Sequence, residues 1–173
     1  MQSQTDILDF LQKQHQQLEV LFSSIPETDF FAVPSGKWSI AQHVGHLSLT
    51  QSRIAFGFTI KDKLPSHTAP SRSFDEIQIL YTSTVARANG AGLLANNPFT
   101  AQLEPDTTQA AIIAGFSSAT AQLVAAVSTW QAAELEQYAM KHPLLGLLSA
   151  KEMLFFSGYH NTHHEQGIRA LML

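Results

Sequence analysis

Apolar residues recur at steps of three and four positions through most of the chain, and this spacing limits the fold more than any other feature. Residues at such steps share one face of an α-helix, and that face then packs against other helices. No internal repeat and no run with strand character is apparent. We therefore expect an all-α protein, a four-helix bundle with an extra short or peripheral helix and long connecting loops. The pattern predicts helices over residues 6–24, 39–61, 73–88, 107–130 and 149–173.

Side chains suited to capping support these boundaries. Ser39 suits the N-cap of the second helix, and Asp106 or Thr107 that of the fourth. The segments 73–76 and 149–152 each carry Ser followed three positions later by Glu, which is the form of a capping box. The connection 89–105, rich in Gly, Asn and Pro, either covers a functional cleft or is simply mobile. The remaining segments expected to be loops are 27–37, 62–72 and 131–147.

Length and composition indicate one globular domain. The 173 residues suit a single domain, 1–173, with 45% hydrophobic residues, 14% charged residues and a formal net charge of -4. A mildly acidic chain without a run of Lys or Arg is not expected to bind nucleic acid. We expect no apolar stretch to reach the length needed to span a membrane, and the N-terminus lacks the pattern of a secretory signal. We therefore expect a cytoplasmic protein without a membrane partner.

Several kinds of site are excluded by what the sequence lacks. There is no cysteine, so disulfides, thiolate metal ligands and a cysteine nucleophile are absent. There is also no glycine-rich phosphate loop, no His-Glu-x-x-His pattern and no nucleophile elbow. Glu152 and Glu165 show no inward pairing and are expected to be capping or solvated. The lack of a Glu-x-x-His pair argues against a di-iron carboxylate bundle.

Two histidines in the last predicted helix form the strongest candidate site. His160 and His164 are one helical turn apart and project from the same face. At about 100° per residue they share a sector with Phe156, whereas His163 lies to one side. This spacing lets two imidazoles bind one cation, and a third from another helix would complete the site. The alternative is that they are core histidines bonded to backbone or hydroxyl groups.

The second predicted helix offers His43 and His46 as the third ligand. Helical phase places His43 nearer the apolar stripe, but a ligand in a cleft need not lie in the middle of that stripe, so both stay open. His43 and His163 are also weak candidates for a catalytic base or for a residue that orients a ligand. The other histidines are expected to be surface residues: His15, His67 and His142.

Three segments resemble motifs of the DinB-like superfamily, which comprises bacterial metal-binding four-helix bundle proteins. Residues 38–47 begin with Trp-Ser and end with His-Leu, like the opening of the family's second helix. Residues 142–146 resemble its H-P-x-x-G motif. Residues 160–168 resemble its H-x-x-H-H-x-x-Q-I pattern, although Gln occurs one position early and Gly167 takes its place. In order and spacing, the resemblance extends from about Trp38 to the C-terminus.

The resemblance implies both a fold and a site. The fold would be an up-down-down-up bundle with a divalent metal, zinc or nickel, in an open cleft. The ligands would be His46, His160 and His164, which favours His46 over His43. Members are commonly homodimers. Those with known chemistry include bacillithiol S-transferases and the mycothiol-dependent maleylpyruvate isomerase, and many members have no assigned activity.

Three functions remain open at this point. The first is a metal-dependent enzyme that acts on a small molecule with a low-molecular-weight thiol as cosubstrate, or by hydrolysis. Because the chain has no thiol of its own, a reacting sulfur would come from the cosubstrate. The second is a module that binds a metal or small ligand without turnover. The third is a structural bundle whose histidines are core polar groups.

Overall fold

The computed structural model describes residues 3–34, 37–90, 103–104 and 106–173. Most of the connection expected over 89–105 lies outside the described residues. In chain order, the elements are α1 (Gln4–Ser24), α2 (Glu27–Phe31), α3 (Ile40–Thr59), the 3-10 helix η1 (Lys61–Lys63), α4 (Phe74–Gly90), α5 (Gln109–Ser128), α6 (Ala132–Gln137), β1 (Ala139–His142), β2 (Gly146–Ser149) and α7 (Ala150–Leu171).

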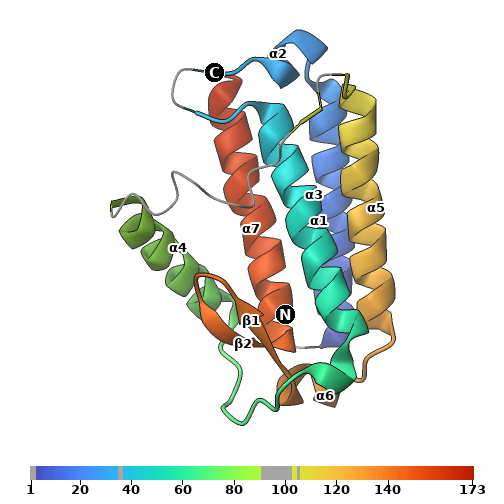
Figure 1. Ribbon diagram of the computed structural model, residues 1–173, viewed down its shortest axis with the longest axis vertical. Helices are drawn as coiled ribbons and strands as arrows, with labels where there is room; N and C mark the ends of the chain where they lie inside the picture. Colours follow the sequence, from blue (N-terminus) through green and yellow to red (C-terminus); the bar gives the residue numbers. More distant parts are fainter. Residues whose placement is uncertain (1–2, 35–36, 91–102, 105) are drawn as a thin grey trace.

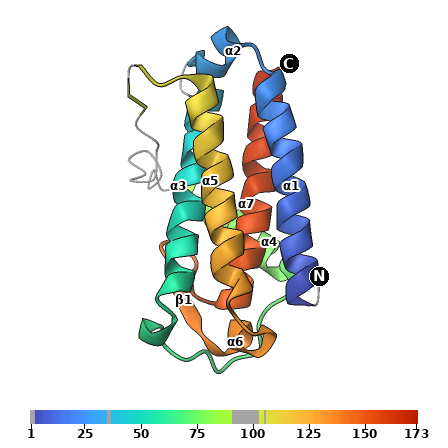
Figure 2. The ribbon, with the colours of Figure 1, turned by 90° about the vertical axis from the view of Figure 1, so that its right-hand side faces the viewer.

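Four long helices, α1, α3, α5 and α7, form a bundle whose axis is vertical in Figure 1. α1 and α7 run in one direction along this axis and α3 and α5 in the other, so their order is up, down, down, up (Figure 1, Figure 2). α4 packs against α7 and leans away from the bundle, and the β1–β2 hairpin lies near the N-terminal end of α7. The expected four-helix bundle with an extra peripheral helix is confirmed.

The helix starts follow from capping side chains. The hydroxyls of Ser39, Ser73 and Ser149 each accept a hydrogen bond from the backbone N–H three residues later. The side chain of that later residue accepts a hydrogen bond from the backbone N–H of the serine. These three predicted caps are confirmed. The N-cap of α5 is instead Thr108, one position beyond Thr107, and its side chain accepts from the third residue of the helix.

Two segments expected to be loops contain regular structure. α2 forms at the start of 27–37, and α6 and the hairpin form within 131–147. β1 pairs antiparallel with β2, and Gly146 at the turn has a φ of 78°, which glycine adopts without strain. The expectation of no strands is therefore wrong. Strands of four residues are too short to display a reliable period of two in the sequence.

Among the described helices, α5 is long and apolar enough to cross a membrane, so the expectation that no such stretch exists is wrong. Length and composition are weak evidence for a span, because the core helix of a bundle passes the same test. α5 packs against α1 and α3. Four of its large apolar residues are buried and contribute to the bundle core: Ile112, Phe116, Leu123 and Val127.

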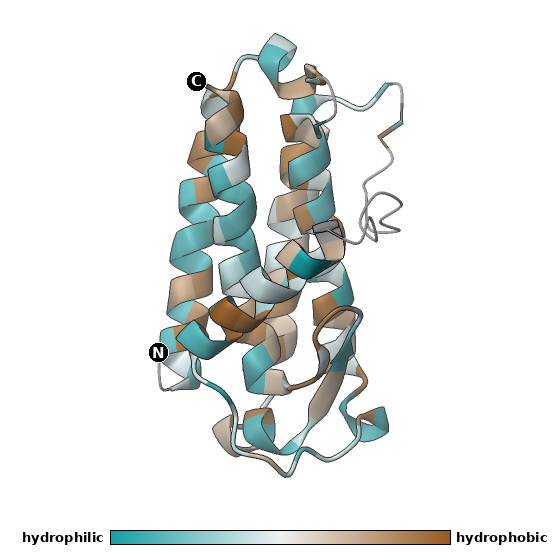
Figure 3. Cartoon of the chain, turned by 90° about the vertical axis from the view of Figure 1, so that its left-hand side faces the viewer, coloured by the Kyte–Doolittle hydropathy of each residue, from teal (hydrophilic) through white to brown (hydrophobic). Residues whose placement is uncertain are grey.

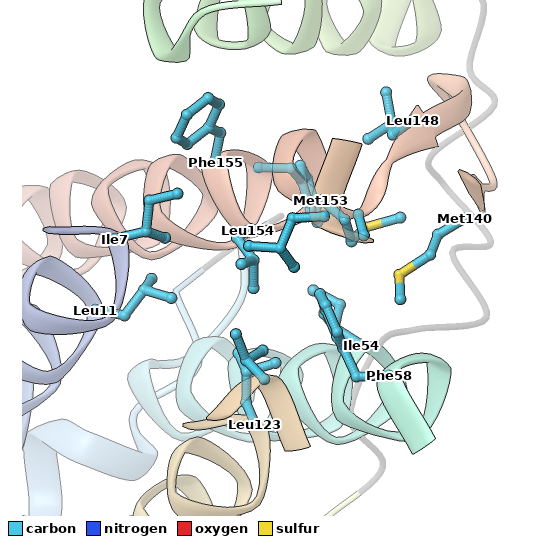
Figure 4. Packing of buried hydrophobic residues seen from close by; sticks show 14 of the residues in the cluster. Ile7, Leu11, Ile54, Phe58, Leu123, Met140, Leu148, Met153, Leu154 and Phe155 are labelled. Carbon is cyan, nitrogen blue, oxygen red and sulfur yellow. The ribbon is translucent and has the colours of Figure 1, made fainter. Parts of the chain in front are cut away.

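Two hydrophobic clusters fill the bundle, one toward each end. The first surrounds the N-terminal half of α7 and includes Leu11, Leu123 and Leu154 (Figure 4). The second includes Phe22 and Leu47 and lies toward the C-terminal end of α7. Hydrophilic and hydrophobic residues alternate along the helices in Figure 3, as expected for amphipathic helices with one buried face.

A layer of buried polar side chains separates the two clusters and draws one residue from each bundle helix. Nδ2 of Asn161 donates to Oε1 of Gln14 at 3.0 Å. Nε2 of Gln51 donates to Oδ1 of Asn161 at 3.1 Å, and the hydroxyl of Thr120 donates to Oε1 of Gln51. Buried polar groups cost free energy unless they are paired, so this layer favours one axial register of the four helices.

Glu152 connects α7 to the segment that precedes α4. Glu152 is 1% exposed, and its carboxylate accepts hydrogen bonds from the backbone N–H and the guanidinium of Arg72 at 2.6–2.9 Å. It also accepts from the backbone N–H of Ser149 at 2.9 Å, which confirms the expected capping role. Burial alone would raise the pKa of Glu152, but these hydrogen bonds lower it below the ordinary value.

We expect Glu152→Gln to reduce the free energy of unfolding by about 2 kcal/mol at pH 7, because it leaves Arg72 without its charged partner. The folded-state pKa of Glu152 is lowered, so its contribution is present above the unfolded pKa of about 4.3 and is lost as pH falls through the folded pKa. The stability difference between wild type and variant should therefore shrink on acidification. Urea unfolding at pH 7 and at lower pH values measures this.

Glu165→Gln is the matched control. Glu165 pairs with Arg169 one turn later on an exposed face, so its loss should cost no more than about 0.5 kcal/mol. Equal losses in the two variants would contradict a special role for the buried carboxylate.

Candidate metal centre

Three imidazoles from two helices meet inside the bundle. Nε2 of His160 lies 3.1 Å from Nε2 of His46 and 3.1 Å from Nε2 of His164. One ligand atom from each residue lies within 4.8 Å of the other two, and all three residues are buried. Such a group has the size of a binding site for a single metal ion.

The helices position these side chains for simple reasons. Four-residue spacing on α7 places His160 and His164 on one face, as the sequence predicts. His46 comes from α3, which packs against both α5 and α7. The apolar stripe of α3 therefore serves two neighbours, and a side chain off its centre reaches α7. Phase alone favours His43, but the structure places His46 in the cluster and leaves His43 half-buried at its margin.

The three Nε2 atoms cannot satisfy one another. An imidazole Nε2 has one bonding direction in the ring plane, which holds either a proton or a lone pair. Nε2 of His160 can therefore form a hydrogen bond with His46 or with His164, but not with both. A shared cation would use all three lone pairs. Zinc–nitrogen bonds of about 2.0–2.1 Å put tetrahedral ligand atoms roughly 3.3 Å apart, close to the two observed separations.

Burial keeps the imidazoles of His160 and His164 neutral. Burial, reinforced by the neighbouring histidines, lowers the pKa of His160 and of His164 well below the ordinary value. A neutral imidazole offers a lone pair to a metal, whereas an imidazolium does not. Trp38 covers the cluster. Its ring stacks on His164 with 6.0 Å between centroids and meets His46 at a steep angle with 5.1 Å between centroids.

His43 contacts the cluster from outside. Its Nδ1 lies 2.8 Å from Nδ1 of His164. If the Nε2 lone pair of His164 faces a cation, the proton of that ring is on Nδ1 and is donated to Nδ1 of His43. Burial lowers the pKa of His43 to about 4, so near pH 7 this ring is neutral and can accept the bond. Gly167 makes room for it, because a Cβ there would lie 3.2 Å from Cε1 of His43.

Aromatic rings from α4, α7 and the hairpin flank His160. The ring centroid of Tyr81 lies 5.9 Å from that of His160 and 5.5 Å from that of His163. The ring of His142 lies 4.3 Å from that of Phe156, which stacks on His160 at 5.0 Å. The sequence gives no signal for Tyr81, because nothing in the pattern of α4 distinguishes it from other core residues.

The expectation of a surface position is wrong for His142. His142 is buried on β1, and the H-P-x-x-G motif was the only sequence signal for it. His15 is half-buried, with its ring centroid 4.9 Å from that of Phe116. His67 is also half-buried, in the segment between α3 and α4. Neither His15 nor His67 belongs to the cluster.

Comparison with known proteins gives one family and two similar folds. TT2238, described as a four-helix bundle protein, covers 97% of this chain and 99% of its own at 16% identity, with a TM-score of 0.60. YfiT from Bacillus subtilis covers 97% of this chain and 85% of its own at 12% identity, with a TM-score of 0.65. YfiT is described as a probable metal-dependent hydrolase with an unusual four-helix bundle topology. No curated protein sequence matches the chain.

At these identities the two structures establish the fold alone. The family comes from the sequence, because the DinB superfamily model matches residues 11–167, nearly the whole chain. The up-down-down-up bundle and the buried histidine cluster agree with that match. The chain therefore belongs to the DinB superfamily.

Proposed function

We propose that the chain is a metal-dependent enzyme that binds one divalent ion, zinc or nickel, through Nε2 of His46, His160 and His164. The observation that carries this proposal is the close approach of three Nε2 atoms that cannot all pair with one another. A shared ion would use the lone pairs of all three atoms at once. The description of YfiT, which has the same fold, supports the proposal.

The chemistry of the ion supports two reactions. A divalent ion with three neutral ligands supplies a Lewis acid that lowers the pKa of an incoming water or thiol, the activation that hydrolysis and S-transfer both need. The description of YfiT favours hydrolysis of a small molecule. The resemblance to thiol-dependent members of the superfamily favours S-transfer as the second candidate, with a low-molecular-weight thiol as cosubstrate.

His43 and His163 are the candidates for assisting this reaction. Nδ1 of His43 is engaged by His164, so we assign His43 the role of orienting that ring. His163 is half-buried, with its ring 5.2 Å from that of His164 and 5.5 Å from that of Tyr81. We assign His163 the role of proton acceptor.

The alternative is a module that binds a metal without turnover. Screening of the zinc-loaded and nickel-loaded protein against ester, amide and thiol-transfer substrates separates the two functions. Turnover that His160→Ala abolishes supports the enzyme. Tight metal binding without turnover of any substrate favours the binding module.

Metal quantification tests the ligand set. We expect wild type to bind about one equivalent of zinc after dialysis, and His46→Ala, His160→Ala or His164→Ala to lose most of it, because two ligands hold zinc much more weakly than three. Atomic absorption on the dialysed proteins measures this. His67→Ala is the control and should keep its zinc. Equal zinc content in all five proteins would contradict the proposal.

The support that His43 gives to His164 is testable through Gly167. We expect His43→Ala to weaken zinc binding by about 10- to 100-fold, the usual effect of removing a residue that orients a ligand. Gly167→Ala should weaken zinc binding as well, because the added methyl group makes a tight contact of 3.2 Å with Cε1 of His43, and that ring must then shift. Competition with a chromophoric chelator measures both affinities.

Gly115→Ala provides the matched control for helix propensity. A Cβ at Gly115 would make only an ordinary contact, 3.5 Å from Oγ of Ser48. This variant should bind zinc like wild type. If the two glycine variants have the same zinc affinity, the proposal that Gly167 leaves room for the ring of His43 to orient His164 is incorrect.

A further inference from the structure

Two polar side chains beside His160 have a donor without an acceptor. Tyr81 is 6% exposed and His142 is 7% exposed. Within the described part of the chain, no residue accepts a hydrogen bond from the Tyr81 hydroxyl or from Nε2 of His142. Neither atom is among the fully enclosed, unpartnered side-chain atoms of the described residues, which are His15 Nδ1, His67 Nδ1 and Ser157 Oγ.

The hairpin turn fixes His142 as a donor. The backbone N–H groups of Leu144 and Leu145 donate to its Nδ1 at 3.1 Å and 3.0 Å. Nδ1 therefore holds a lone pair, and the proton of the neutral ring is on Nε2. Burial lowers the pKa of His142 to about 4, which keeps the ring neutral near pH 7. The result is an N–H donor whose ring is held in place by the turn.

Tyr81 is a donor for a related reason. A phenol hydroxyl carries its proton near pH 7, because its ordinary pKa is about 10. The neighbouring Tyr159 differs, because its hydroxyl already has a partner in the hydroxyl of Thr82 at 3.0 Å. Of these two tyrosines, only Tyr81 has its hydroxyl available to another molecule.

The two donors approach the same part of α7 from different elements. Tyr81 lies on α4 and His142 on β1, and both elements lie beside α7 (Figure 1). Both rings contact Phe156, with centroid distances of 5.5 Å and 4.3 Å. Phe156 in turn stacks on His160. Phe156 therefore links His142 to the proposed ligand His160, whereas the ring of Tyr81 contacts that of His160 directly.

We propose that the Tyr81 hydroxyl and the Nε2–H of His142 each donate a hydrogen bond to a carbonyl or carboxylate oxygen of the substrate. This inference rests on the proposed function and adds the substrate class to it. Two neutral donors suit an oxygen with lone pairs and offer nothing to an ammonium group. Donors that are already in place when the substrate binds also suit a carbonyl group that gains negative charge during nucleophilic attack.

Acetate binding to the zinc-loaded protein tests the proposal, with acetate as the probe. Tyr81→Phe removes only the hydroxyl. His142→Asn keeps a side-chain oxygen that can accept from the turn N–H groups but removes the Nε2 donor. Tyr159→Phe is the matched control. Zinc content and acetate affinity are measured for each protein, the latter by titration calorimetry.

We expect both variants to keep their zinc and to bind acetate about tenfold more weakly than wild type, and the Tyr159→Phe control to stay within about twofold. In the nitrogen-15 spectrum of wild type, the Nε2-bound proton of His142 should shift when acetate is added. If His142→Asn does not fold, Tyr81→Phe and this spectrum decide. Acetate affinities within twofold of wild type in the folded variants, or no shift, would overturn the inference.

The two proposals fail in different ways. A wild-type protein that binds zinc but not acetate overturns only the substrate class. A wild-type protein that binds no zinc overturns the proposed function, and the inference that rests on it fails with it.

Discussion

The site depends on the axial register between α3 and α7. The buried chain of hydrogen bonds that includes Gln51 and Asn161 sets this register, next to the histidine cluster in the sequence of both helices. A slip of one helical turn would move one helix by about 5.4 Å relative to the other. That movement exceeds the 3.1 Å between Nε2 of His46 and Nε2 of His160. The polar layer therefore holds the register of α3 and α7 more strictly than the hydrophobic clusters can, because apolar packing tolerates small shifts better than paired polar groups do.

The same burial that makes the histidine cluster costly also prepares it for a cation. Desolvation keeps the imidazoles of His160 and His164 neutral, and neutral imidazoles have lone pairs to offer. Nδ1 of His164 contacts His43, whose ring packs above Gly167, and Nε2 of His164 faces the cluster. In the superfamily pattern a glutamine stands at the position of Gly167. This chain has a glycine there, and the ring of His43 occupies the space next to it.

The sequence predicts the parts of this protein that depend on local periodicity. It predicts the four bundle helices and the shared direction of His160 and His164, because both follow from the 3.6-residue repeat. It does not decide between His43 and His46 by phase, because α3 has two packing partners. The resemblance to the superfamily resolved that choice. The positions of Tyr81 and His142 depend on how α4 and a short hairpin pack against α7, and no local pattern encodes those long-range contacts.

The most direct measurement of the central claim is zinc K-edge X-ray absorption of the metal-loaded protein. If His46, His160 and His164 share one ion, the spectrum should show three imidazole nitrogen atoms at about 2.0–2.1 Å, with the outer-shell scattering of their rings. His46→Ala should reduce that imidazole count by one. A zinc coordinated mainly by oxygen, or a spectrum that His46→Ala leaves unchanged, would contradict the account.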